Sequence, residues 1–242
     1  MLTMMALVKE KDGQMHIKEV DIPKVGGGEV LIEVKAVGIC GSDIRLYRNK
    51  HIFFPPVIIG HEFSGVIKEV GAGVKEWSVG DRVTCEPHAL SCGECAHCKK
   101  GNIHICASKR SLGWGVDGAC ADYISVSKSL LHKIPDSMSF EEAAVLEPTA
   151  IVTHALLERT QITAGDFVVV LGAGTIGLLS AMVAQVKVSH EVMKLTNNFG
   201  ADVVIEASGA EAAANMAVDI VRKHGKIGAI GESGDDAWIR LA

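Results

Sequence analysis

The chain is poor in the features that mark secreted, membrane-spanning or nucleic-acid-binding proteins. Its 242 residues contain no uncharged apolar run near the roughly 18 residues that a membrane span needs. The first residues lack the apolar core and the small-residue cleavage site of a signal peptide. The net charge is −5, and acidic and basic residues are mixed without a basic stripe or polybasic segment. These absences predict a cytoplasmic protein that binds neither nucleic acid nor a membrane surface.

Aromatic residues are also scarce, at 5% of the chain, whereas the apolar share is 48% and there are 26 glycines. A chain of this length and apolar content can bury a large core, in one large or two ordinary domains. In the first half, apolar and polar residues alternate at Glu29–Gly38 and Gly65–Gly71, which is typical of strands. Residues 1–150 are therefore predicted to form a β-rich domain, with a lobe at 91–106.

The pattern changes in residues 151–242, where apolar runs of strand length alternate with segments of helical spacing. Helical spacing over 141–162 is interrupted by Pro148, which is expected to break the helix. Strands are predicted at Phe167–Leu171, Asp202–Ser208 and Gly225–Gly231, and helices follow the first strand, close near Asn198–Gly200, and span Ala210–Lys223. Strands alternating with helices predict an α/β domain with a parallel sheet covered on both faces.

Four of the seven cysteines are crowded into one short segment, at Cys92, Cys95, Cys98 and Cys106. A disulfide framework is the alternative explanation, but it belongs to short secreted domains, and the cysteine count here is odd. C-x2-C spacing presents thiolates to one ion, so the segment predicts a structural zinc site closed by four sulfurs. We expect the nearby His97 and His104 to be loop residues. Cys85 and Cys120 are expected to be buried free thiols.

A dinucleotide-binding motif of the form G-x-G-x-x-G occupies Gly172–Gly177. It directly follows a predicted strand and opens a predicted helix, which is the context that the motif requires. Gly172 permits the tight turn, Gly174 lets the backbone approach a pyrophosphate, and Gly177 permits close helix packing. With Thr175 and Ile176, these residues are the candidate cofactor-binding turn for NAD or NADP.

The acidic residue that completes such a motif has no secure counterpart. An Asp or Glu is expected roughly 20 residues on, at the end of the next strand, to bind the ribose hydroxyls. Glu191 lies near that distance, but its surroundings favour a helix. The sequence therefore predicts that the nucleotide domain lacks a strand and part of a helix here.

A second group of potential metal ligands is spread over three turn-like segments around Cys40, His61 and a carboxylate. A catalytic zinc needs about three protein ligands and an open position for the substrate oxygen. Packed core residues remain the alternative explanation for a lone cysteine or histidine.

The motifs CGSD (40–43), GHEFSG (60–65), LEPTA (146–150) and GAGTIG (172–177), with the cysteine lobe, stand in the order of a known family. The chain resembles the zinc-dependent medium-chain alcohol dehydrogenases, nearest to the sorbitol and polyol dehydrogenase branch. The resemblance implies a GroES-like catalytic domain followed by a Rossmann doubly wound domain, here incomplete. It also implies one catalytic and one structural zinc, NAD or NADP, and an alcohol or polyol substrate.

The resemblance assigns roles to individual residues at the catalytic zinc. Cys40, His61 and Glu62 are expected at the metal, and Glu147 is expected to reach it directly or through its water. Ser42 matches the hydroxyl that receives the proton of the substrate alcohol. The family often carries a histidine three residues further on, where this chain has Arg45, which cannot shuttle a proton at neutral pH. His51 is a speculative substitute.

The family continues well beyond the length of this chain, with segments that complete the catalytic domain and a dimer-forming edge. A homo-oligomer, dimer or tetramer, is therefore expected for the complete form. Threonine and butanediol dehydrogenases are alternatives within the family. A truncated, non-catalytic zinc-binding relative is an alternative of another class. The cysteine lobe argues against a zinc-free reductase of the same superfamily.

Overall fold

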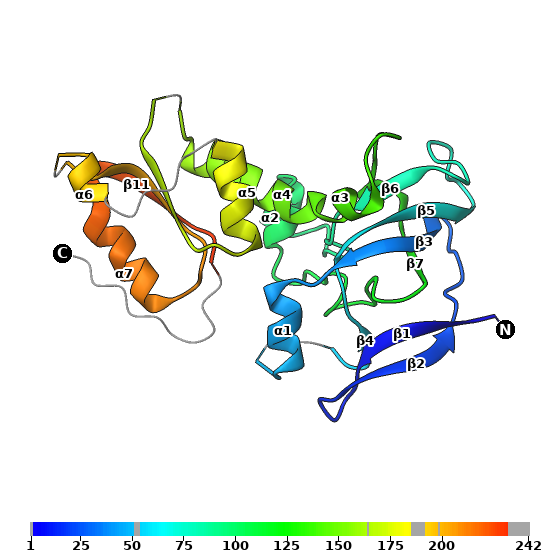
Figure 1. Ribbon diagram of the computed structural model, residues 1–242. Coiled ribbons are helices and arrows are strands. Elements are labelled where there is room, and N and C mark those ends of the chain that lie inside the picture. Colours follow the sequence, from blue (N-terminus) through cyan, green and yellow to red (C-terminus); the bar gives the residue numbers. More distant parts are fainter. Residues whose placement is uncertain (1, 51–53, 164, 185–191, 198, 232–242) are drawn as a thin grey trace. The chain divides into compact units, whose positions relative to one another are not determined.

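The computed structural model describes residues 2–50, 54–163, 165–184, 192–197 and 199–231 (Figure 1). The chain divides into two compact units, Met1–Glu147 and Pro148–Ala242. Each unit is built around its own sheets and its own buried apolar clusters.

The first unit is formed by two antiparallel sheets. The smaller sheet has the order β2-β1-β4, with β1 at Thr3–Lys9, β2 at Met15–Asp21 and β4 at Val57–Ile58. The larger sheet has the order β7-β3-β5-β6-β8, with β3 at Glu29–Gly38, β5 at Glu62–Val70, β6 at Arg82–Cys85, β7 at Tyr123–Ser127 and β8 at Leu131–Lys133. The strands predicted from alternating patterns in the first half are thus confirmed as β3 and β5.

The core of the first unit lies on one face of the larger sheet, where alternate side chains of each strand are buried. Val30 and Ile32 of β3, and Phe63 and Ile67 of β5, are 0% exposed, and Val83 of β6 joins them. Period-two burial of this kind fixes the register, because a slip of one residue would turn every apolar side chain outward. The register pairs Gly38 with Glu62. It therefore brings the end of β3 beside the beginning of β5.

Short helices complete the first unit. They are α1 at Gly41–Tyr47, α2 at Ala96–Lys99 and α3 at Phe140–Ala144, with 3-10 turns at Ile103–Ile105 and Lys128–Leu130. Helix α1 begins directly after β3 and Cys40 is its N-cap. Helix α3 is closed at its start by a capping box in which the Ser139 hydroxyl accepts the Glu142 N–H at 3.1 Å.

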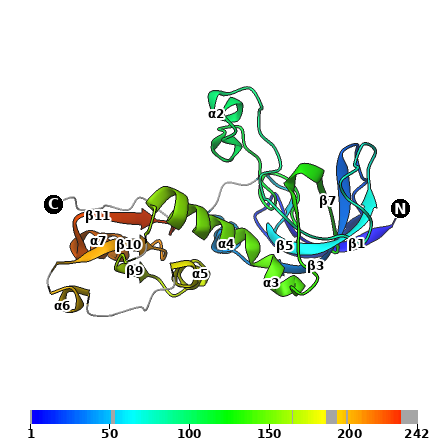
Figure 2. The same ribbon diagram turned by 90° about the horizontal axis from the view of Figure 1, so that it is seen from above.

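The second unit contains a parallel sheet with the order β11-β10-β9, which can be followed in Figure 2. Its strands are β9 at Val168–Leu171, β10 at Ala201–Glu206 and β11 at Val221–Ala229. Its helices are α4 at Leu146–Thr153, a π-helix at His154–Thr160, α5 at Thr175–Ala184, α6 at Val192–Leu195 and α7 at Glu211–Ile220.

Apolar clusters cover both faces of this sheet. On one face, Val168 and Val170 pack with Leu156 of the π-helix and with α5. On the other face, Val169 and Val204 pack with Ala217 of α7. Burial on both faces explains the nearly continuous apolar runs of these strands. The predicted α/β class, with a doubly wound parallel sheet in the second half, is confirmed.

Pro148 was expected from its position in the sequence to break the helix, but it does not. The interruption falls at Val145, between α3 and α4, and Pro148 is the third residue of α4. The N–H groups of the first turn have no acceptor within the helix, so a proline there removes no hydrogen bond. The predicted break at Pro148 was wrong, because the new helix already starts at Leu146.

Several element boundaries in the second unit also differ from the prediction. Helix α7 ends at Ile220 and β11 begins at Val221, so the predicted helical stretch to Lys223 is already strand. The partner of Ala201 is Val221 but the partner of Val203 is Lys226, so β11 carries an irregular bulge. Of the helix expected to close near Gly200, the described residues contain the single turn α6.

Candidate functional site

The end of β3 and the beginning of β5 bring three potential metal ligands together. Cys40 follows β3, while His61 and Glu62 stand at the start of β5. The Cys40 sulfur, a His61 ring nitrogen and a Glu62 carboxylate oxygen all lie within 4.8 Å of one another. Ligands that share a zinc ion at about 2.0–2.3 Å must lie this close. The geometry therefore permits all three to bind one ion.

Burial makes this group chemically unusual. His61 is 4% exposed and Glu62 is 8% exposed. Burial raises the pKa of Glu62, and the charge of Asp43 raises it further, while Cys40 opposes the shift. Burial also raises the pKa of the Cys40 thiol. Without a cation, burial shifts both groups toward their neutral forms, because a buried anion beside another anion is costly. One sulfur, one imidazole nitrogen and one carboxylate oxygen form a donor set that fits zinc.

Two neighbours orient the His61 ring. The ring of Trp114 contacts it edge-on, with centroids 4.9 Å apart and planes at 82°. Asp43 Oδ1 lies 3.7 Å from His61 Nδ1, and the other oxygen of Asp43 accepts the Cys40 N–H at 2.9 Å. Asp43 is itself buried. A carboxylate behind a ligand histidine fixes which nitrogen faces the metal.

Glu147 is not a member of this close group. The group nevertheless affects the pKa of Glu147. Burial, and in second place the charge of Glu62, raise that pKa to about 7. A carboxyl group with such a pKa can hold or release a proton at neutral pH. The structure therefore brings Glu62, rather than Glu147, into ligand distance of Cys40 and His61.

Ser42 and Arg45 lie on α1, one turn apart. The Ser42 hydroxyl oxygen is buried beside Cys40. Its presence lowers the pKa of the Cys40 thiol, against the larger opposite effect of burial. Arg45 Nη2 donates to the Lys50 carbonyl at 3.4 Å. The suggested substitute His51 lies outside the described residues.

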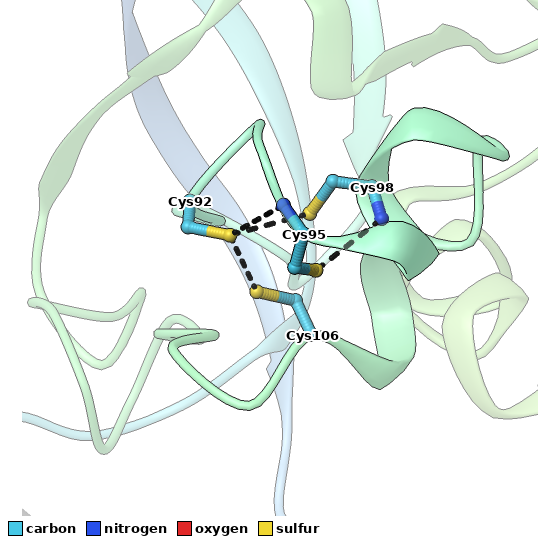
Figure 3. A group of neighbouring side chains, drawn as sticks. All are labelled: Cys92, Cys95, Cys98 and Cys106. Carbon is cyan, nitrogen blue, oxygen red and sulfur yellow. Dashed lines mark hydrogen bonds between the residues drawn. The ribbon is translucent and has the colours of Figure 1, made fainter.

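The cysteine lobe forms a second group, in which the four sulfurs point toward one another (Figure 3). Their sulfur atoms all lie within 4.8 Å, with Cys92 3.6 Å from Cys106 and 3.9 Å from Cys98. These separations exclude a disulfide, whose sulfurs are about 2.05 Å apart, and all the cysteines are free. The lobe geometry thus fits one tetrahedral zinc ion with four thiolates.

Backbone N–H groups support the lobe thiolates. Cys95 is the N-cap of α2, and its sulfur accepts the Cys98 N–H at 3.5 Å. The Cys95 N–H in turn donates to the Cys92 sulfur at 3.4 Å. Backbone bonding with Cys92 is the main cause that lowers the pKa of Cys106 to about 6. Donated hydrogen bonds stabilise the thiolate form that a metal requires.

The remaining residues near the lobe behave differently from the four cysteines. Neither His97 nor His104 belongs to the sulfur group; the His104 ring faces that of His88, with centroids 6.4 Å apart. Cys85 is a buried free thiol, as predicted. The prediction was wrong for Cys120, which is free but only half-buried, beside Gly60.

The glycine turn of the second unit connects β9 to α5. Gly172 has φ of 111°, and a Cβ there would lie 3.0 Å from the Ser208 nitrogen. A Cβ on Gly177 would lie 1.8 Å from the Gly172 carbonyl oxygen, so only glycine fits. Around Gly174 no described atom lies within 4 Å of such a Cβ. The turn is thus closed on its packed side and open at Gly174, where Thr175 and Ile176 begin α5.

The acidic residue Glu206, which the sequence analysis missed, supports this turn from the end of β10. Its buried carboxylate accepts the Ser208 N–H at 2.8 Å, the Ser208 hydroxyl at 2.6 Å and the Gly209 N–H at 3.1 Å. This segment is the one against which Gly172 packs. An acid ending an apolar strand was the only signal in the sequence. The proposed ribose acid Glu191 lies outside the described residues.

Comparisons with known proteins agree with this arrangement. The profile of the alcohol dehydrogenase GroES-like domain matches residues 26–136. Sorbitol dehydrogenase of Halalkalibacterium halodurans is 38% identical over 264 aligned residues, covering 94% of this chain and 77% of that protein. D-arabitol-phosphate dehydrogenase of Enterococcus avium is 32% identical, covering 95% of this chain and 76% of that protein. A zinc-binding dehydrogenase from Sinorhizobium meliloti bound to NADP has a TM-score of 0.91 and 27% identity, covering 100% of this chain and 80% of that chain.

A GroES-like unit with a cysteine lobe, followed by a parallel α/β unit with a glycine turn, defines a two-domain dehydrogenase. The chain belongs to the zinc-type medium-chain alcohol dehydrogenase family, near the polyol dehydrogenases. Family membership makes it an oxidoreductase. None of the described helices has the length and continuous hydrophobicity that crossing a bilayer requires.

Proposed function

We propose that the protein is a zinc-dependent dehydrogenase that transfers hydride from a polyol or secondary alcohol to NAD or NADP. The observation that carries this proposal is the close grouping of Cys40, His61 and Glu62, at most 4.8 Å apart and buried together. Polyol dehydrogenases among the relatives support the substrate class. The cysteine lobe is the proposed structural zinc site.

The proposed roles follow from the chemistry of each residue. Cys40, His61 and Glu62 would hold zinc, which supplies Lewis acidity at the substrate oxygen. NAD or NADP would supply the hydride acceptor for the alcohol carbon, and Ser42 would receive the hydroxyl proton. Glu147, with its pKa near 7, can hold or release a proton beside Glu62 at neutral pH.

The glycine turn is the proposed cofactor contact in the second unit. Backbone N–H groups at the start of α5 can bind a pyrophosphate, because the helix dipole favours an anion there. The open space around Gly174 gives the cofactor room to approach the backbone. Glu206 holds the neighbouring segment in place through its three hydrogen bonds.

A matched pair of variants tests the proposal. Cys40→Ser should lose about one zinc per chain and should abolish cofactor reduction with polyols. Cys98→Ser should also lose about one zinc, from the lobe, and should lower thermal stability, since metal-binding energy is folding energy. Elemental analysis and nucleotide reduction with sorbitol, butanediol and threonine measure both effects. Full zinc content in Cys40→Ser would contradict the proposed catalytic site.

A further inference from the structure

An arginine outside the metal-ligand group is held close to it. The guanidinium carbon of Arg110 lies 4.0 Å from the centroid of the Phe54 ring. The Phe54 N–H donates to the Trp114 carbonyl at 3.0 Å, and the Trp114 ring is the one that contacts His61. The contacts from Arg110 to His61 therefore run through two residues, Phe54 and Trp114. Arg110 stands in the same loop as Trp114, although its guanidinium group cannot act as a metal ligand.

The loop that carries Arg110 is rigidly built. The Arg110 backbone exchanges two hydrogen bonds with Leu90, at 2.9 and 3.0 Å. Three backbone N–H groups, those of Trp114, Gly115 and Val116, donate to the Ser111 carbonyl. These bonds involve only the main chain. The side chain of Arg110 takes no part in these bonds, so the backbone that carries it is held in place without it.

The charge of Arg110 is not neutralised within the described part of the chain, where no carboxylate forms an ion pair with it. Its one side-chain hydrogen bond runs from Nη1 to the Lys109 carbonyl at 3.2 Å. Arg110 is half-buried, and Phe54 below it is 46% exposed. Lys109 precedes it, so two cations stand side by side. A planar guanidinium stacked on an aromatic ring presents its free N–H groups in a fixed fork.

We propose that Arg110 binds an anionic group at the far end of the substrate, and that the substrate is a polyol carrying a terminal phosphate ester. The proposal rests on the proposed function, because it assumes that the alcohol is oxidised beside His61. Guanidinium and phosphate match in geometry and form paired, charge-assisted hydrogen bonds. Trp114 would then form the wall along which the carbon chain lies.

The position of Arg110 favours a distant phosphate over a carboxylate beside the oxidised carbon. In threonine, one carbon separates the carbinol carbon from the carboxylate. In a hexitol 6-phosphate oxidised at C2, four carbons and an ester oxygen separate the carbinol carbon from the phosphorus. Because the contacts from Arg110 to His61 pass through Phe54 and Trp114, the longer molecule suits the separation. An L-threonine arm in the experiment distinguishes the two sources of negative charge.

The test compares sorbitol 6-phosphate with sorbitol on the zinc-loaded protein, by calorimetric binding and by cofactor reduction. A charge-assisted contact contributes enough for about ten- to hundredfold tighter binding of the phosphate ester. Arg110→Gln should abolish that preference and leave sorbitol binding unchanged. Arg110→Lys, which keeps the charge but loses the fork, should fall between them. Lys109→Gln is the matched control and should change the preference by less than about threefold.

Each outcome supports or overturns the proposal. Equal affinity for the two compounds, or a preference that survives in Arg110→Gln, would overturn it while leaving sorbitol oxidation, and thus the proposed function, intact. Loss of L-threonine binding in Arg110→Gln, with sorbitol 6-phosphate unaffected, would replace phosphate by carboxylate and overturn it as well. If the zinc-loaded protein neither bound nor oxidised any of the compounds, the proposed function itself would fail.

Discussion

Lys9 is a charged residue with no exposed surface, at the end of β1. Its ammonium group donates to the carbonyls of Gly13 at 2.5 Å and Tyr47 at 3.4 Å. Burial lowers the pKa of Lys9, because removing the ammonium from water disfavours its charged form. Tyr47 is the last residue of α1, whose N-cap is Cys40. Lys9 therefore ties the helix that carries Ser42 to the smaller sheet.

Replacing Lys9 should be costly for stability. In Lys9→Met the carbonyls of Gly13 and Tyr47 lose a donor, so we expect a loss of about 1–3 kcal/mol in the free energy of unfolding. Denaturant unfolding measures it. Lys18→Met on the neighbouring strand β2 is the control, because Lys18 pairs with Glu10 at the surface. Exposed pairs contribute about 0–1 kcal/mol. Equal losses in the two variants would refute the role given to Lys9.

The hydrogen bonds of Asp202 should make the stability of the second unit depend on pH. Its carboxylate accepts the Phe167 N–H at 2.7 Å and an Arg222 N–H at 2.5 Å, and these bonds hold its pKa below the usual range. Because the pKa is lowered in the folded protein, the ionised carboxylate stabilises the fold above about pH 3.9, which is the unperturbed pKa. This contribution is lost as the pH falls through the folded-state pKa. Asp202→Asn should lower the melting temperature at pH 7 and much less at pH 3. A melting-temperature difference that did not shrink on acidification would contradict this.

Among the elements, the β9–α5 turn contains one tightly packed glycine and one with open space around it, and substituting each in turn tests this difference. A methyl group at Gly177 would meet the Gly172 carbonyl at 1.8 Å, whereas one at Gly174 would meet no described atom within 4 Å. Gly177→Ala should therefore destabilise the protein by about 1–3 kcal/mol or more, since a clash with backbone forces the helix to shift. Gly174→Ala should leave the free energy of unfolding nearly unchanged but weaken nucleotide binding. Chemical unfolding and calorimetric titration with NADP separate the two effects.

The lobe is an element without an apolar core of its own, so its order depends on the four sulfurs. None of the residues of α2 is buried. Metal removal by a chelator should therefore loosen the segment 91–106 specifically. Hydrogen exchange should show faster amide exchange there and little change in the strand β5, which is buried independently of the lobe. Unchanged exchange in the lobe after zinc loss would show that the loop folds without metal.

At the scale of the whole molecule, cofactor affinity depends on an acidic acceptor for the ribose hydroxyls. Within the described part of the chain, β9 is hydrogen-bonded to β10 on one side and has no strand on the other. Glu191, the candidate acceptor, lies outside the described residues. A charged acceptor for a ribose hydroxyl contributes about 1.5–3 kcal/mol, so NAD should bind about tenfold to over a hundredfold more weakly than to a domain that supplies such an acceptor. Calorimetric titration with NAD and NADP tests this; micromolar affinity for NAD would contradict it.

Part of the grouping of the candidate metal ligands could be predicted from the sequence, because it is local. The spacing of Cys92, Cys95 and Cys98 already places their sulfurs on one turn, and the structure brings Cys106 to them. The β9–α5 turn could also be predicted from the spacing of its glycines, since close backbone approach at Gly177 excludes every other residue. The strands β3 and β5 followed from alternation, which reflects one buried face.

The tertiary structure alone decided what depends on contacts distant in sequence. The pairing of Gly38 with Glu62 selects Glu62, and not Glu147, as the carboxylate within ligand distance of Cys40. No local pattern announces this, because strand register is fixed by the shared buried face of the sheet. The start of α4 before Pro148 likewise depends on packing, since proline is compatible with a first helical turn or with a break.

The sequence by itself thus determined the family, the two-unit order and the two sets of candidate ligands. The structure added Glu206 as the support of the glycine turn, Trp114 as the contact of His61, and Arg110 stacked on Phe54. No sequence motif marks these residues, because the role of a single acid, indole or guanidinium group depends on the residues that contact it in the folded protein. Short-range spacing places three of the lobe sulfurs on one turn, whereas long-range packing brings Glu62 to Cys40 and sets the Trp114 ring against His61.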